Sequence, residues 1–326
     1  MTSTPSNVLS PPIPAPAIAA GLGFLDARGL IDASEGQRFL PPAWPVLFIV
    51  IALVVASASL SGPGAGGAQA AVVVALVAAW FGHFLIRRSI GRSIAAEVQA
   101  VSAIEELVQL RRWMEAADLV QRVLSRPMYL RERRLTALVC LATLLTRYHR
   151  FTDARVVHEY LLENGAEMDA SASHAIRVAR AMGMLREDHL VDADKAMTDL
   201  RREVNRARDE VRRQRGGEAA DDVQSAGLAL LELYRDVKTR HYEEAIQGFA
   251  RSLPILREQL GMRVADAWLL VATARHGLGE TDSARSAYAN ATALAPSVEL
   301  HRRYPETAAL AEVYSATPTP AKAGQS

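Results

Sequence analysis

The chain has 326 residues, half of them hydrophobic, and a formal net charge of +1 at pH 7. This length allows about two domains, and the balanced charge argues against nucleic acid as the main partner. Cys140 is the single cysteine, so the chain has neither an internal disulfide nor a CxxC motif for a metal or for redox chemistry.

Residues 1–40 begin with a segment rich in Pro, Ala and Ser. It lacks the basic start and the immediate apolar core of a cleavable signal peptide. A segment of this composition buries too little apolar surface to fold alone, so we predict a disordered or interfacial tail. Within it, residues 23–40 are predicted to form a short helix at a membrane surface.

The stretch from Phe39 to Ile86 contains no Asp, Glu, Lys or Arg. It holds two apolar runs, at about 44–61 and 68–86, which flank a glycine-rich turn. A bilayer core requires about 20 apolar residues in a helix, and the absence of water there makes a spanning segment helical. We therefore predict a two-helix transmembrane hairpin in residues 41–92. Two buried helices of a soluble protein are the alternative, although such helices normally have polar faces.

Arginines flank this hairpin on both outer sides, whereas the turn between the two runs is uncharged. The positive-inside rule then places both termini in the cytoplasm. The chain is thus predicted to be an integral protein of the cell membrane, the inner membrane if the source is a bacterium, with the lipid bilayer as one partner. The flanking residues are Arg28, Arg38, Arg87, Arg88 and Arg92.

After the second run, apolar residues recur every three or four positions and predict that the helix continues toward Trp113. These residues are Ile94, Val98, Val101, Ile104 and Val108. From there to Pro296 the pattern is helix, short turn, helix, with no strand signal. The sequence therefore predicts an all-α fold.

The clearest helix pair is Ala265–Pro296. Its first helix has a large–apolar–small cluster, a glycine follows in the turn, and its second helix has a small–aromatic–small series. Small residues let two helices approach closely, and the ring fills the gap beside them. The residues are Trp268, Val271, Ala272, Gly279, Ala284, Tyr288 and Ala291. This segment resembles a tetratricopeptide repeat (TPR), except that Arg275 stands where that family usually has an aromatic residue.

Weaker copies precede this pair, each with an alanine in the second helix. Their intervals are 37 to 52 residues, against about 34 in the family, and generic helical hairpins remain the alternative for the earliest copies. The resemblance implies TPR-like repeats over residues 93–300. A capping helix at Pro305–Tyr314 and a disordered tail follow within 301–326. The alanines are Ala117, Ala154, Ala193 and Ala245.

Stacked helix pairs of this kind curve into a superhelix whose concave face presents the first helix of each pair. The resemblance therefore implies that a protein or peptide partner binds in this concave groove. The residues expected to contact the partner are Thr143, Arg147, Met182, Tyr234, Leu269, Thr273 and His276.

The segment from Arg201 to Asp222 is highly charged, and Arg206–Glu210 and Asp209–Arg213 have the i, i+4 spacing of helical ion pairs. Two interpretations stay open: a solvated helix followed by a glycine linker, or a surface for anionic lipid or an acidic partner. Nucleic acid is disfavoured because no aromatic residues lie among the charges.

The sequence contains no catalytic motif. The histidines form no HExxH pair, and the glycine-rich loop at 62–67 is not followed by Lys-Ser/Thr. His149 and His241 are predicted to lie at corresponding turns of two repeats. We expect no catalysis, cofactor, metal or small-molecule substrate, and predict a membrane-anchored TPR-type scaffold or adaptor at the cytoplasmic face. A cell-envelope assembly or secretion component with external repeats, and a helical-repeat enzyme with an unfamiliar active site, are the alternatives.

Overall fold

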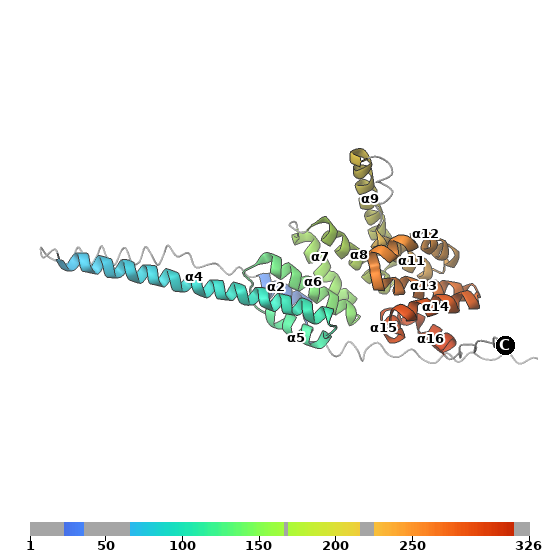
Figure 1. The fold of residues 1–326 in the computed structure, drawn as a ribbon, viewed down its shortest axis with the longest axis horizontal. Coiled ribbons are helices and arrows are strands. Elements are labelled where there is room, and N and C mark those ends of the chain that lie inside the picture. The colour runs from blue at the N-terminus through green and yellow to red at the C-terminus, as the bar shows by residue number, and fades with distance from the viewer. Residues whose placement is uncertain (1–22, 36–65, 166–168, 216–224, 316–326) are drawn as a thin grey trace, which may run out of the picture. The chain divides into compact units, whose positions relative to one another are not determined.

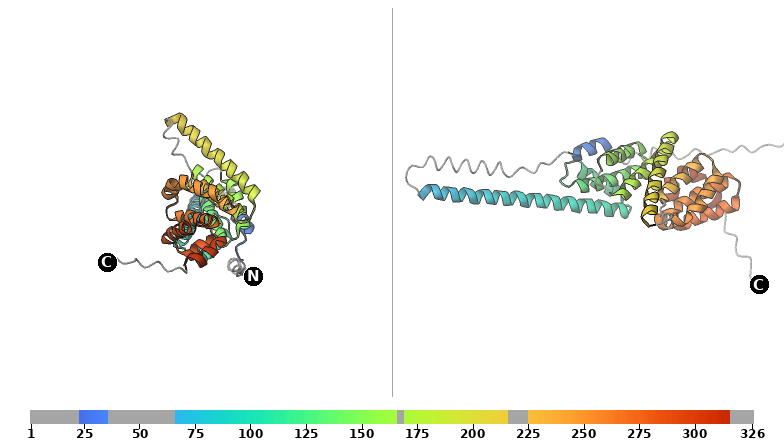
Figure 2. Two further views of the ribbon diagram at one scale, coloured as in Figure 1. Left: turned by 90° about the vertical axis from the view of Figure 1, so that its right-hand side faces the viewer. Right: turned by 90° about the horizontal axis from the view of Figure 1, so that it is seen from above.

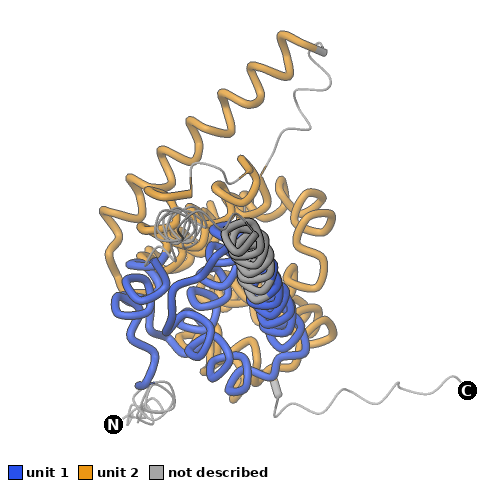
Figure 3. The backbone as a smooth tube through the Cα atoms, turned by 90° about the vertical axis from the view of Figure 1, so that its left-hand side faces the viewer, with its two compact units in different colours: residues 1–157 blue, residues 158–326 orange. Residues whose placement is uncertain are grey.

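The computed structural model describes residues 23–35, 66–165, 169–215 and 225–315, with only the backbone for most of residues 66–89. All regular secondary structure in these ranges is helical (Figure 1), which confirms the predicted all-α class. The chain divides into two compact units, residues 1–157 and 158–326 (Figure 3).

The predicted transmembrane hairpin is described only in part. Its first run, at about 44–61, lies outside the described residues. Its second run falls within α4 (Gly66–Gln109), which continues without a break past Gly91. Among the helices that the structure describes, none combines the length and the apolar character needed to cross a membrane.

Unit 1 is built on the C-terminal part of α4, against which α5 (Trp113–Leu124) and α6 (Arg131–Arg147) pack. Val101 and Ile104 of α4 are fully buried, as the predicted helical spacing requires. The Glu97 carboxylate is also buried, and it accepts hydrogen bonds from the backbone N–H of Tyr129 at 2.9 Å and of Leu130 at 3.4 Å. These bonds satisfy amide groups at the start of α6 and fix that helix against α4.

Residues 27–35 form a helix that packs on protein, where the sequence predicted part of a disordered or interfacial tail with a short helix at a membrane surface. They form α2 (Ala27–Glu35), which packs on α5 and α6. Its buried residues, Ala27, Leu30, Ile31 and Ser34, recur at intervals of three and one along a single helix face. A narrow apolar stripe of this kind suits a protein surface as well as a membrane surface, and here it lies on protein.

Unit 2 contains three packed helix pairs. These are α8 (Ala170–Arg186) with α9 (Leu190–Arg215), α11 (Ala226–Lys238) with α12 (Tyr242–Leu260), and α13 (Val264–Gly277) with α14 (Thr281–Leu294). The first helices of successive pairs also pack together, α8 on α11 and α11 on α13. A 3-10 turn, η2 (Gly261–Arg263), leads into α13, and α7 (Phe151–Asn164) spans the boundary between the units.

The chain of unit 2 continues after α14 into three short elements: α15 (Ser297–Arg303), the 3-10 turn η3 (Pro305–Thr307) and α16 (Ala308–Ser315). Helix over residues 305–314 was predicted, and Pro305 occupies the first turn, where its missing N–H is harmless. Helix α15 was not predicted. We call residues 297–315 the C-terminal segment.

Five described helices, α4, α6, α8, α11 and α13, end in the same turn. The second residue after the end of each helix has a positive φ of 59–79°. Its N–H donates to the carbonyl three residues back at 3.0–3.3 Å, and the next N–H donates to the carbonyl five residues back at 2.8–2.9 Å. This pair of bonds defines the Schellman motif. The positive-φ residues are Arg111, His149, Asp188, Arg240 and Gly279.

These turns fix the register of the repeats. Five residues after each one lies a buried alanine whose N–H donates to the carbonyl four residues earlier at 2.8–3.0 Å. The equivalent positions are Ala116, Ala154, Ala193, Ala245 and Ala284. In the first repeat the equivalent alanine is therefore Ala116, one residue before the predicted Ala117. The residue that corresponds to His149 is Arg240, instead of the predicted His241. Both errors arise because a backbone turn usually marked by glycine holds an arginine at both sites.

Candidate functional site

The seven residues expected to contact a partner are divided between the two units. Thr143 and Arg147 belong to α6 in unit 1, where Thr143 is exposed and the Arg147 guanidinium lies 5.1 Å from the centre of the Trp113 ring. The other five lie on α8, α11 and α13 of unit 2, and the structure brings these three helices together. We call the surface formed by α8, α11 and α13 the first-helix face. The five residues are Met182, Tyr234, Leu269, Thr273 and His276.

Three of these five residues are buried. The exposed fraction is 9% for Met182, 2% for Tyr234 and 0% for Leu269, and all three belong to one hydrophobic cluster with Tyr304 and Tyr314. Thr273 is partly exposed, and its hydroxyl donates to the Leu269 carbonyl at 3.0 Å. At Met182, Tyr234 and Leu269 the first-helix face is therefore covered, where the sequence predicted an open groove, whereas His276 is exposed.

The chain's own C-terminal segment covers this face. The Tyr304 ring is fully buried and meets the Tyr234 ring of α11 edge to face, with centroids 5.3 Å apart. The guanidinium of Arg186, the last residue of α8, also lies 5.3 Å from the centre of the Tyr304 ring. Such edge and cation–π contacts add to the hydrophobic stabilisation of a buried ring.

An ion pair joins the C-terminal segment to α13. Arg303 Nη1 lies 2.8 Å from Asp266 Oδ1 and 2.9 Å from Oδ2, and the Asp266 side chain is completely buried. Burial raises the pKa of Asp266, while the nearby guanidinium groups of Arg303, Arg263 and Arg186 act to lower this pKa. Residues 303 and 304 together thus contact all three helices of the first-helix face.

A second set of contacts lies farther along the C-terminal segment. The Tyr314 hydroxyl is 2.9 Å from His276 Nδ1. His301 links the Tyr288 hydroxyl at 3.1 Å to the Thr307 hydroxyl at 3.0 Å, and the Thr307 hydroxyl donates to the Tyr304 carbonyl. This network holds the segment on α13 and α14.

The tyrosine hydroxyls on this face differ in their surroundings. Burial raises the pKa of Tyr234, and the neighbouring Glu306 carboxylate raises it further. Burial raises the pKa of Tyr304 to about 12. The Tyr304 hydroxyl is buried and has no hydrogen-bond partner among the described residues. The described residues around Tyr304 therefore contact its aromatic ring but provide no hydrogen-bond partner for its hydroxyl.

Sequence reasoning missed the residues that occupy the face: Arg303, Tyr304 and Tyr314. One local signal was present, because the residue before a proline avoids the helical region. Tyr304 precedes Pro305, has φ −130° and ψ 76°, and is thereby turned out of the helical run. Lys238, the last residue of α11, caps the end of α8 by donating to the Leu185 carbonyl and pairing with Asp188 at 2.8 Å.

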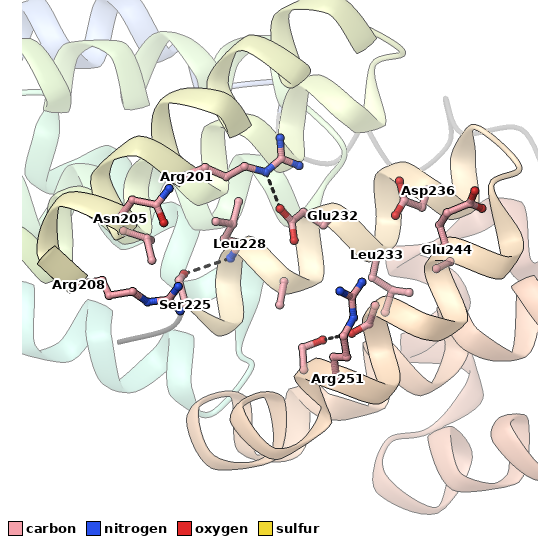
Figure 4. Close-up of a pocket in the computed structure, with 15 residues that line it drawn as sticks. Arg201, Asn205, Arg208, Ser225, Leu228, Glu232, Leu233, Asp236, Glu244 and Arg251 are labelled. Atoms are coloured by element: carbon pink, nitrogen blue, oxygen red, sulfur yellow. Dashed lines mark hydrogen bonds and ion pairs between the residues drawn. The ribbon is translucent and has the colours of Figure 1, made fainter. Parts of the chain in front are cut away.

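A pocket of about 730 Å³ lies on the other side of α11, between α9 and α12 (Figure 4). We call it the second-helix pocket. An ion pair crosses it, from Arg201 of α9 to Glu232 of α11 at 2.7 Å. Arg201, Asn205 and Arg208 lie at one end in Figure 4, and Asp236 and Glu244 lie at the other. Its walls thus carry both signs of charge.

Helix α9 extends beyond the helices that it packs against, as Figure 1 and Figure 2 show. Most residues of its second half are exposed. Arg213 was predicted to pair with Asp209, but it pairs with Glu210 at 3.3 Å and donates to the Asp209 backbone carbonyl. Gln214 also donates to Glu210, at 2.6 Å. Exposed local contacts of this kind contribute little to stability.

Outside the first-helix face, burial shifts the pKa values of His158 and Cys140, which lie apart from each other in the sequence. Burial lowers the pKa of His158 to about 4, with help from the positive charge of Arg180. Burial raises the pKa of the Cys140 thiol to about 11. In the part of the chain that the structure describes, no group of three or more His, Cys, Asp or Glu residues is arranged to hold a metal.

Comparison with known proteins adds no identity. No protein-family model, no curated protein and no solved structure matches the chain.

Proposed function

We propose that the chain is a membrane-anchored, TPR-like adaptor that binds a segment of a partner protein on the first-helix face, on the cytoplasmic side. The main support is that this face already holds a peptide segment through a few specific contacts. Tyr304 contacts both Tyr234 and Arg186, and Arg303 pairs with the buried Asp266. Peptide-binding faces concentrate their energy in such anchors.

The membrane anchor in this proposal is supported by the sequence from Phe39 to Ile86, which lacks formal charges, and by the arginines on its outer sides. In a Cys140→Ser background, Ser61→Cys should react with a membrane-impermeant thiol reagent in intact cells, whereas Ser326→Cys should not. The reverse pattern would place the repeats outside the cytoplasm, as expected for an envelope-assembly or secretion component.

The binding role is tested by photocrosslinking in cells, with a photoreactive amino acid at one position of the full chain. Thr273 is partly exposed on the first-helix face, and Gln247 is exposed on α12 and serves as the matched control. We expect a crosslinked partner from position 273 that position 247 does not give. Crosslinks from position 247 alone would contradict binding on the first-helix face and favour the second-helix side.

A further inference from the structure

We propose that the C-terminal segment is an intramolecular ligand of the first-helix face, and that the partner displaces it with an arginine followed by an aromatic residue. This inference rests on the proposed function and names the chemistry of the partner. The chemistry of the partner follows from the contacts that the first-helix face makes with residues 303 and 304.

The first requirement is a guanidinium group. Asp266 is completely buried, and both of its carboxylate oxygens lie within 2.9 Å of Arg303 Nη1. Arg263 lies farther away, at 3.8 Å, and its side chain is largely exposed. A buried carboxylate that loses its partner is strongly destabilising. A partner that removes Arg303 must therefore bring its own arginine to Asp266.

The second requirement is an aromatic ring. The Tyr304 ring contacts both the Tyr234 ring and the Arg186 guanidinium, and it is fully buried. Its hydroxyl has no hydrogen-bond partner among the described residues. Since an unsatisfied buried hydroxyl is unfavourable, the position selects for a ring and does not select for tyrosine over phenylalanine.

The C-terminal segment has the features of a ligand that can be released. Its two α-helices have 7 and 8 residues, and helices this short are marginal in water on their own. Val298 and Val313 are exposed, so part of its apolar surface is not used against the first-helix face. The covalent link to α14 gives the segment an effective concentration of about millimolar. A free partner segment at a lower concentration must therefore bind the first-helix face more tightly than the C-terminal segment does.

The test uses the full chain in detergent with a specific protease site inserted between Pro296 and Ser297. The probe is a fluorescently labelled synthetic peptide of residues 297–315. We expect the uncut chain not to bind the probe and the cut chain to exchange its released segment for the probe, with at least a tenfold difference in apparent Kd. In the probe, Arg303→Ala with Tyr304→Ala should abolish exchange, while Tyr304→Phe should bind equally well or better.

Two outcomes would overturn the inference. In the first, the cut chain, carrying Trp268 as its only tryptophan, keeps its native fluorescence but never exchanges the segment. In the second, cutting unfolds unit 2, so the segment is a permanent part of the core. Each is distinguishable from failure of the adaptor role. A partner that crosslinks at position 273 equally in cut and uncut chains would support the adaptor role and contradict the intramolecular ligand. Exchange of the segment without any crosslinked partner would support the intramolecular ligand and contradict the adaptor role.

Discussion

The two sides of α11 hold their ion pairs in different surroundings. On the first-helix face, Tyr234 and its neighbours are buried, and the charged Asp266 of α13 is paired with Arg303 from a distant part of the chain. On the second-helix side, Glu232 pairs with Arg201 where both side chains remain partly exposed. Removing one partner of a buried pair costs far more than removing one partner of an exposed pair, because the remaining charge stays buried without compensation. Single substitutions at the buried pair should therefore destabilise unit 2 much more than substitutions at the exposed pair.

The largest expected effect is the loss of Asp266 or Arg303. Arg303→Ala leaves a buried carboxylate without its closest partner and should lower the free energy of unfolding by about 3–5 kcal/mol. The matched control, Arg201→Ala, removes an exposed pair and should lower it by less than about 1 kcal/mol. Urea unfolding followed by Trp268 fluorescence measures both, in a chain with Trp44, Trp80 and Trp113 replaced by Phe. Equal losses would contradict the contrast between the two sides.

A second prediction concerns pH and a buried group on α7. The pKa of His158 is about 4 in the folded chain and about 6.5 in an unfolded chain. The unfolded state binds the proton first, so stability is complete above about pH 6.5 and falls as the pH decreases toward 4, by up to about 3 kcal/mol. Replacing His158 by leucine should remove this slope from the urea midpoints. An unchanged slope would show that other groups cause it.

The close helix contacts give the third prediction. Ala284 is fully buried at the start of α14, so Ala284→Leu should overpack the site and destabilise unit 2 by about 1–3 kcal/mol. Ala265 of α13 is also fully buried, so its replacement by leucine should be similarly harmful. Ala289 on α14 is exposed, and Ala289→Leu should change stability by less than about 0.5 kcal/mol. If all three variants melt alike, the helix register is wrong.

The smallest expected effects compare two copies of the same turn. Gly279 and Arg240 both have positive φ, at 79° and 63°. A side chain in this region costs about 1–2 kcal/mol, so Gly279→Ala should destabilise unit 2 by about 1 kcal/mol. Arg240→Gly should relieve strain and stabilise it by up to about 1 kcal/mol, less the added entropy of the unfolded chain. Melting temperatures that shift in the same direction would rule out a shared Schellman geometry.

The sequence predicted those features that depend on local chemistry. Gly279 lies in a positive-φ turn, the second-helix alanines from Ala154 onward are buried, and a helical turn begins at Pro305. The four turns without glycine were not predictable in the same way, since arginine carries no signal for positive φ, and histidine and aspartate are enriched there but also occur widely elsewhere.

The cover on the first-helix face was beyond sequence reasoning for a different reason. Asp266 and Arg303 are separated by 37 residues, and Tyr234 and Tyr304 by more, so only the folded chain pairs them. A buried tyrosine and an exposed groove tyrosine have the same helical spacing. Similarly, the stripe of Leu30 and Ile31 fits a membrane surface or α5 and α6, and tertiary packing decides between them.

A double-mutant cycle between Asp266 and Arg303 tests most directly whether the C-terminal segment is held on the first-helix face. Asp266→Asn, Arg303→Gln and the double variant are compared with the parent chain by urea unfolding, with Trp268 as the only tryptophan. The two side chains are in contact, so we predict a coupling energy of about 1.5–3 kcal/mol. Additive effects, with a coupling near zero, would contradict the ion pair and with it the placement of the segment.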